Sequence, residues 1–253
     1  MILTAAAWGL LVDASLVAGA VAAAVTSLPE RVAAMLTAFG GGILLSAVAL
    51  ELVPEADRGA GAALTAAGLA AGTAIYISAD AWLNRNERRK AMRRMAHAAG
   101  AGRAMPTQEE RDSSARGESV AAGLVVDGVP ESLALGLTVA EGEVGIALLA
   151  GILVGNLVEA YGAAQPILVG GRSRRFAIGL LAGIGLALAA ATTLGGTVLA
   201  DAGGEIIGTA QAVAAGAVLA VVSIAIIPYA FKEVSSLAAS ATVAGFIGGY
   251  LLS

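Results

Sequence analysis

The sequence has no cysteine, a single histidine and few charged residues for its length. Without cysteine it can form neither a disulfide framework nor a thiolate metal site. The one imidazole, His97, lies in a polar basic segment, where we expect it to be solvated rather than to bind a metal. Charged residues make up 13% of the 253 positions, against about 25% in soluble domains. This scarcity excludes an ordinary soluble globular protein.

The sequence is instead rich in hydrophobic residues. They account for 58% of the chain, and many apolar runs are longer than the ~18 residues that mark a transmembrane helix. The 34 glycines and the many alanines suit helix packing in membranes, where small residues let backbones approach closely. We therefore predict an all-α polytopic membrane protein.

Eight transmembrane helices are predicted within a single domain that covers residues 1–253. Each has about the ~20 residues that a helix rising 1.5 Å per residue needs to cross the hydrocarbon core. Their approximate bounds are 4–27, 33–53, 61–83, 119–139, 145–169, 176–200, 207–230 and 236–253. Residues 84–118, between the third and fourth spans, are polar and rich in arginine, and we expect a partly disordered basic cytoplasmic loop.

Basic residues predict the orientation. Taken alternately, the connections on one side hold nearly all of them, while the other side holds Arg58 and several acids. Positive residues stay cytoplasmic, so both termini are expected outside, extracellular or periplasmic, in a plasma or inner membrane. The arginines of the long loop are expected to lie against anionic lipid, and no nucleic-acid partner is expected.

A faint repeat relates the second span to the seventh. The stretch 42–56 resembles 216–230, with a proline near the end of each, at Pro54 and Pro228. Under the predicted topology these spans run in opposite directions, as an inverted repeat requires. The arrangement would then be 3+2+3, with the fourth and fifth spans between two related halves.

Two carboxylates and a proline interrupt the fourth span. Asp127 and Glu131 lie four residues apart, on one helical face, with Pro130 between them. Ionised carboxylates in lipid cost at least a few kcal/mol, so they usually face a cavity, a partner or an ion. The proline also deprives the Val126 carbonyl of its helical donor. These oxygens together predict a site at the centre of the protein.

The fifth span supplies a second pair, Asn156 and Glu159, which also share one helical face. A tight turn joins the two spans, so they should pack antiparallel with these faces together. Three carboxylates in contact would repel one another unless protonated or bridged by a cation. A divalent cation is the simplest solution, because it prefers such oxygens. A single buried acid could instead be protonated and bonded to a neighbouring helix, an interpretation that weakens for two paired motifs.

Other polar residues in the spans have less certain roles. Gln165, beside Pro166, could line a path, and Glu51 could be either a vestibule ligand or a solvated helix end. Thr192 and Thr193 could bond only to their own helix. We assign Glu51, Gln165 and Thr192 as secondary candidates for metal binding.

The stretch from Asp127 to Gly136 resembles the fourth-helix signature of the ZIP (Zrt/Irt-like) metal transporters, His-Asn-x-Pro-Glu-Gly-Leu-Ala. The stretch from Asn156 to Ala160 is similar to their fifth-helix motif, His-Asp-x-Pro-Glu-Gly. The end of the second span, from Leu50 to Ala56, resembles their leucine-His-x-x-Pro-Glu-Ala pattern. The resemblance implies a transporter that moves a divalent metal by alternating access. It implies neither an enzyme nor a prosthetic group.

Carried over residue by residue, the resemblance leaves Asp127, Glu131, Asn156 and Glu159 as metal ligands. Asp127 and Gly128 replace the fourth-helix histidine and asparagine, and Gly155 replaces the fifth-helix histidine. Thr192 stands where some members have a sixth-helix glutamate, so a two-metal centre is doubtful. An oxygen-rich site favours manganese, iron(II) or magnesium, although carboxylates also bind zinc. The resemblance and the glycine-rich helix faces allow a homodimer.

Two other interpretations stay open. A transporter of the same fold could move another solute, or protons, through the acids as a relay. A non-transporting membrane protein could keep the motifs only for helix packing. A pH-dependent current without metal would favour the first, and indifference of the protein's stability to metals would favour the second.

Overall fold

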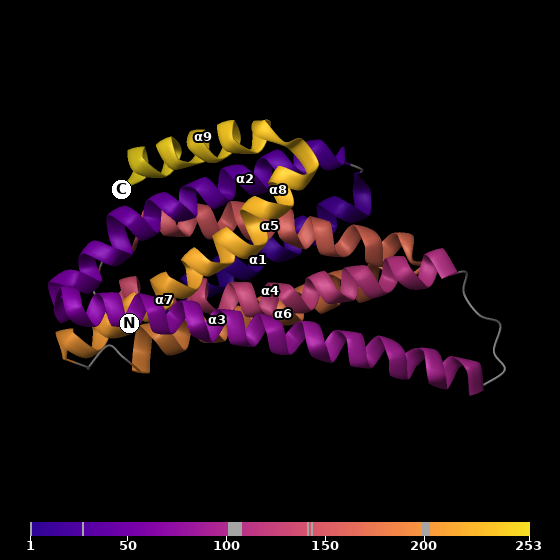
Figure 1. Ribbon diagram of the computed structural model, residues 1–253, viewed down its shortest axis with the longest axis horizontal. Coiled ribbons are helices and arrows are strands. Elements are labelled where there is room, and N and C mark those ends of the chain that lie inside the picture. Colours follow the sequence, from indigo (N-terminus) through magenta and orange to yellow (C-terminus); the bar gives the residue numbers. More distant parts are fainter. Residues whose placement is uncertain (1, 27, 101–107, 141, 143, 199–202) are drawn as a thin grey trace.

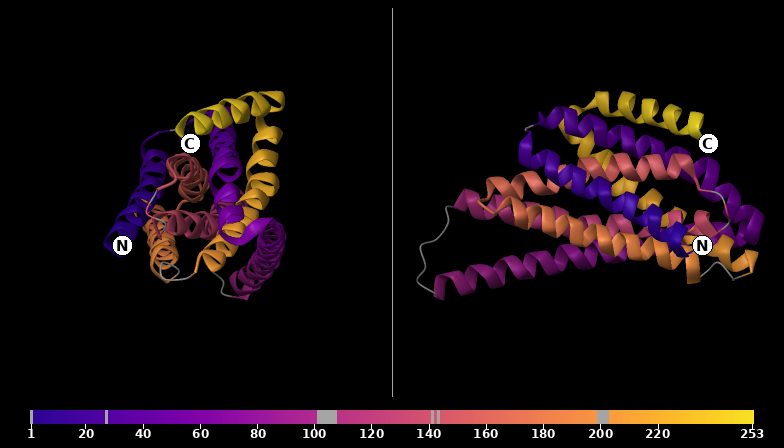
Figure 2. Two further views of the ribbon diagram at one scale, coloured as in Figure 1. Left: turned by 90° about the vertical axis from the view of Figure 1, so that its left-hand side faces the viewer. Right: turned by 180° about the vertical axis from the view of Figure 1, so that it is seen from behind.

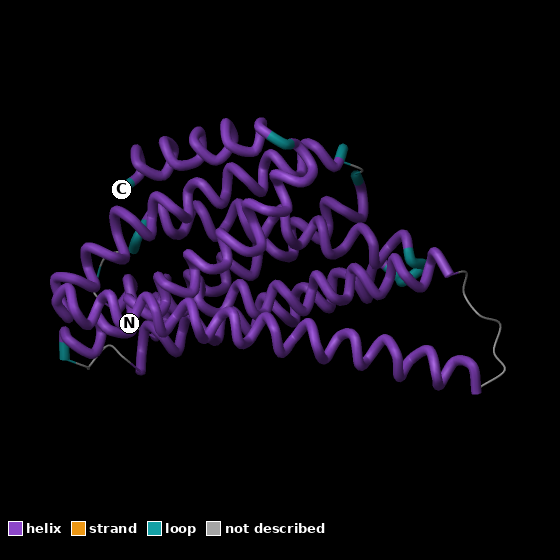
Figure 3. The backbone as a smooth tube through the Cα atoms, in the orientation of Figure 1, coloured by secondary structure: helices purple, strands orange, loops and turns teal. Residues whose placement is uncertain are grey.

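The computed structural model describes residues 2–26, 28–100, 108–140, 142, 144–198 and 203–253, without the side chains at 83–120, 122 and 127. All regular secondary structure in these ranges is helical (Figure 3). The α-helices are α1 (Ile2–Val25), α2 (Glu30–Ala47), α3 (Val53–Gly100), α4 (Gln108–Ala140), α5 (Ile146–Val169), α6 (Arg174–Val198), α7 (Gly204–Val221), α8 (Ile227–Val234) and α9 (Ser236–Leu252). Two π-helical turns, η1 (Val48–Leu52) and η2 (Val222–Ile226), connect α2 to α3 and α7 to α8.

Six helical stretches of the described chain are long and apolar enough to cross a membrane. One of them, Glu30–Trp82, has 53 residues and is interrupted at Gly61, whose φ of 77° and ψ of 160° are not helical. Only glycine adopts such a conformation readily, and the chain reverses direction between α2 and the distal part of α3 (Figure 1). The last apolar helix, Ser236–Leu252, is shorter. The chain is therefore a helical, multi-pass membrane protein.

Residues 84–118, expected as a partly disordered loop, have a largely helical backbone where the structure describes them. Helix α3 continues to Gly100 and α4 already begins at Gln108, so most of this segment has a helical backbone (Figure 1). Arginine, lysine, methionine and alanine, which dominate residues 85–99, are good helix formers and extend the helix beyond its apolar part. Residues 101–107, and the side chains of the whole segment, lie outside the described residues.

The helices pack in reciprocal pairs. Helix α1 lies along α6, and α4 lies along α5. Helix α2 packs against α9, and α7 packs against α3. In the same way, α1 packs against α5, and α6 packs against α4. Both ends of the chain lie at the same end of the bundle (Figures 1 and 2).

Glycine makes the two outer pairings possible. A Cβ at Gly42 would meet the Thr242 carbonyl oxygen, and one at Gly245 would meet that of Phe39, so α2 and α9 touch backbone to backbone. In the same way, Gly216 lies against the Leu69 carbonyl, and Gly72 against that of Val213. Such close approach lets van der Waals contact hold helices together where lipid offers no hydrophobic driving force.

The two π-helical turns occur at equivalent places. Each has 5 residues, follows an α-helix of 18 residues and lies just before a proline, Pro54 or Pro228. A proline ring clashes with the carbonyl one turn back and supplies no N–H. A wider turn at this point accommodates the ring, and turns of this kind are frequent at functional sites.

Candidate functional site

The two motif helices, α4 and α5, pack against each other as the sequence predicted. Glu131 of α4 is buried, with 6% of its surface exposed, although it is a glutamate inside an apolar helix that also contains Pro130. Asp127 lies on the same helix one turn earlier, but its side chain is outside the described residues. A carboxylate buried in this way needs polar partners, because transferring an unpaired charge from water into an apolar environment is very costly.

Other polar residues of α4 and α5 are buried as well. Asn156 of α5 is 2% exposed, and its Nδ2 finds no hydrogen-bond partner. The Ser132 hydroxyl, beside Glu131, is also fully buried without a partner. Leaving a buried polar group unsatisfied costs about 1–3 kcal/mol, and such groups often mark a functional site. Both motif helices thus carry buried polar groups that packing alone does not require.

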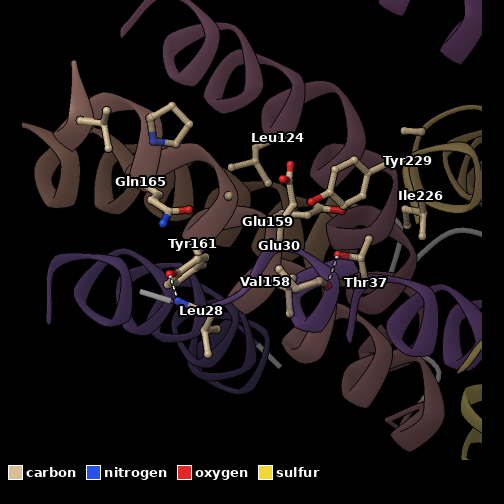
Figure 4. Close-up of a pocket in the computed structure, with 15 residues that line it drawn as sticks. Leu28, Glu30, Thr37, Leu124, Val158, Glu159, Tyr161, Gln165, Ile226 and Tyr229 are labelled. Atoms are coloured by element: carbon tan, nitrogen blue, oxygen red, sulfur yellow. Dashed lines mark hydrogen bonds between the residues drawn. The ribbon is translucent and has the colours of Figure 1, made fainter. Parts of the chain in front are cut away.

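A cavity of about 720 Å³ adjoins this region, and Glu159 lines it. Gln165 lies in the same wall, about two turns further along α5. The cavity lies near the connection between α1 and α2, at the end of the bundle opposite the termini (Figures 1 and 4). Its lining residues are Leu28, Glu30, Ala33, Thr37, Leu124, Val158, Glu159, Tyr161, Gly162, Gln165, Pro166, Val169, Ala225, Ile226 and Tyr229.

Glu30 and Tyr229 are among the polar lining residues that were not predicted from the sequence. Glu30 begins α2, and its side chain is grouped with those of Glu159 and Tyr229 in Figure 4. In the sequence Glu30 follows Pro29 and reads as part of a polar turn. Tyr229 follows Pro228 at the end of an apolar run. The proline before each was a turn signal, but nothing local shows that both residues face one cavity with Glu159.

Tyr161 connects the motif helix to the turn between α1 and α2. Its hydroxyl accepts a hydrogen bond from the Leu28 amide at 2.5 Å and donates one to the Thr26 carbonyl at 3.4 Å. The side chain is 2% exposed. Because Glu159 lies two residues before Tyr161, this contact fixes the wall of the cavity relative to α1 and α2.

Replacing Tyr161 with phenylalanine should lower the stability of the folded protein by about 1–2 kcal/mol, since both hydrogen bonds are lost and the Leu28 amide is left without its acceptor. The apparent melting temperature in detergent measures this. Tyr250→Phe, at a position that is 61% exposed, is the matched control and should change little. Equal melting temperatures for the two variants would show that the two hydrogen bonds of the Tyr161 hydroxyl do not stabilise the protein.

The three secondary candidates lie in different places. Gln165 lines the cavity with Glu159. The Thr192 hydroxyl donates to the Leu188 carbonyl at 3.3 Å, and that of Thr193 to Ala189 at 2.8 Å, so the expected bonds to their own helix are confirmed. Glu51, on η1, is half-buried, and its Oε1 accepts a hydrogen bond from the Ala147 amide of α5 at 3.3 Å. It is therefore not a solvated helix end.

No group of three or more histidine, cysteine, aspartate or glutamate side chains in the described part of the chain could hold a metal. The predicted set contains only two such side chains there, Glu131 and Glu159, because Asp127 is outside the description and Asn156 is an amide. The four-ligand arrangement therefore stays a prediction.

Comparison of the chain with protein-family models and with curated proteins gives no match. The resemblance of the motifs on α4 and α5 therefore rests on their own residues.

Proposed function

We propose that the protein is a ZIP-like transporter of divalent metal cations, which binds its cargo between α4 and α5. The observation that carries the proposal is the cavity of about 720 Å³ at one end of the bundle, which is lined by Glu159, near the middle of α5. A cavity lined by a carboxylate in the interior of a membrane protein is what an ion path requires. Glu131 of α4 and Asn156 of α5, both buried, would provide further oxygen atoms.

Eight crossings in a 3+2+3 inverted repeat fit the packing of the helices. Gly61 would divide the 53-residue stretch into two crossings, and α9 would supply the last. Exchanging α1 with α6, α2 with α7, α3 with α9 and α4 with α5 maps each main helix pairing onto another or onto itself. The paired glycines and the paired π-helical turns obey the same exchange. Transporters of this architecture bind cargo where the repeats meet, and here that place is the interface between α4 and α5.

The distribution of basic residues supports an orientation with the cavity open to the cytoplasm. The connections near the cavity, at Arg31 and at Arg172 to Arg175, are basic, and basic residues remain on the cytoplasmic side of a plasma or inner membrane. Both termini would then be outside. The structure would represent an inward-open state, from which rocking of one helix group against the other would give access from outside.

Oxygen atoms alone define the proposed site. Glu131 and Glu159 would hold the ion, and Asp127 and Asn156 would complete its shell. Carboxylate and amide oxygens suit manganese, iron(II) or magnesium, and they also bind zinc. Transport of this kind breaks no covalent bond, so the proposal includes neither an enzymatic activity nor a prosthetic group.

Purified protein reconstituted into liposomes that enclose a metal-sensitive dye tests the proposal. We expect uptake of Mn²⁺ or Zn²⁺ that saturates with concentration and exceeds that of protein-free liposomes. A proton current that needs no metal would favour the proton-relay alternative. Absence of both, with monodisperse protein whose melting temperature no divalent metal changes, would favour the non-transporting alternative.

A further inference from the structure

Glu51 makes an unusual contact between two helices. It lies on the π-helical turn η1, and its carboxylate reaches the first turn of α5, where Oε1 accepts the hydrogen bond from Ala147. The Leu148 amide also interacts with this carboxylate. Oε2 is buried and has no hydrogen-bond partner. The contact lies at the end of α5 that is opposite the cavity.

The sequence of α5 leaves room for this carboxylate. The first amides of a helix have no partner within the helix, and the residue before α5, Gly145, has no side chain that could cap them. A Cβ at Gly145 would lie 2.5 Å from the Glu51 Oε2 atom. Glu51 therefore takes the place of a local cap, and its negative charge is favourable at a helix N-terminus. In this way η1 is joined to the helix that carries Asn156 and Glu159.

The other half of the molecule has no such carboxylate. Within the repeat, Glu51 of η1 corresponds to Ala225 of η2, since both lie fourth in their π-helical turns. Ala225 lines the open cavity. One end of the path thus has a carboxylate bound to the motif helix, while the equivalent position at the other end has only a methyl group.

We infer that Glu51 is the outer gate of the path: its carboxylate bound to the start of α5 keeps the outer end closed while the inner end is open. This inference rests on the proposed function, because a gate implies a path between the two ends. Outward opening requires the carboxylate to leave the amides of α5. Glu51 is thus a positioning residue that acts through α5 and does not bind cargo in the closed state.

Cysteine labelling tests the gate without added metal, and the natural sequence is a ready background because it contains no cysteine. The outer reporter is Thr138→Cys, at a position 2% exposed whose side chain lies 3.5 Å from the Gly145 amide. The inner reporter is Thr37→Cys, in the cavity wall. A positively charged, membrane-impermeant methanethiosulfonate should label the inner reporter from the cytoplasmic side and leave the outer one protected.

Glu51→Ala and Gly145→Ala should each raise the labelling rate of the outer reporter roughly tenfold, in line with loss of a favourable carboxylate at a helix N-terminus. Gly145→Ala places a methyl group 2.5 Å from Oε2, so the carboxylate must shift although Glu51 itself is unchanged, and the two variants disturb the same contact in different ways. The inner reporter should react at its original rate in both variants, which shows that the fold is kept.

Protection of the outer reporter in both variants would overturn the inference. Faster labelling of both reporters would overturn it too, because that pattern indicates a loosened bundle. Metal uptake by wild-type protein is measured separately. If labelling behaves as expected but no metal is carried, the proposed cargo is wrong and the gate stands.

Discussion

Replacing Glu159 or Glu131 with alanine should reduce metal uptake into liposomes roughly 10- to 100-fold. A contact to a charged group contributes about 1.5–3 kcal/mol, and each 1.4 kcal/mol corresponds to about tenfold in affinity. Glu159 lines the cavity and Glu131 is buried on the neighbouring helix, so each variant would leave the ion with fewer negative charges. The double variant should show only background uptake.

Matched controls separate loss of the site from loss of fold. Glu159→Asp keeps the charge and should retain part of the activity, whereas Glu159→Gln should behave like the alanine variant. Glu205→Ala, in the exposed first turn of α7, removes a carboxylate away from the site and should transport normally. Uptake by the double variant at the wild-type rate would show that the cargo does not pass between α4 and α5.

Adding a methyl group at Gly72 and Gly216 together should prevent normal assembly of the bundle. Each new Cβ would meet a backbone carbonyl of the partner helix, at Val213 for Gly72 and at Leu69 for Gly216. Backbone cannot move aside as a side chain can, and overpacking costs about 1–3 kcal/mol for each substitution. Two such changes in one interface should therefore lower the apparent melting temperature strongly, or leave mainly aggregated protein in size-exclusion chromatography.

Two glycines of α6 provide the control for that experiment. A Cβ at Gly179 or Gly183 would have no atom of the described residues within 4 Å. Gly179→Ala with Gly183→Ala makes the same chemical change and improves helix propensity, so this variant should extract and elute like the wild type. If the variant with alanine at both Gly72 and Gly216 were as stable as this control, α3 and α7 would not need the close approach that the structure shows.

Much of the fold could be predicted from composition and hydrophobic run length. The apolar runs that end near Val25, Val169 and Val198 correspond to α1, α5 and α6, because a run of that length in lipid can satisfy its backbone only as a helix. The polar stretch after Trp82 was harder, since low hydropathy signals exit from the membrane but does not tell a loop from a helix that continues into water. The good helix formers there decided in favour of a helix.

The candidate site was predictable in part. The sequence indicated that Glu131 and Asn156 are buried, because each belongs to a pair of polar side chains on one face of its own apolar helix. The roles of Glu30 and Tyr229 did not follow, because each depends on helices that are far apart in the sequence and meet only in the folded bundle. Glu51 shows the same limit: its place near the end of the second span left a vestibule ligand and a solvated helix end open, and its partner Ala147 is 96 residues away.

The sequence by itself determined that this chain is a helical membrane protein with carboxylates in its interior, because hydrophobic length and the cost of buried charge are local properties. Only the tertiary structure decided which end of the bundle has the cavity. It places Ala225 in the cavity wall and Glu51 on the first turn of α5. Both positions precede a proline in similar sequence surroundings, and the packing of the helices places one in the wall of the cavity and the other against the first turn of α5.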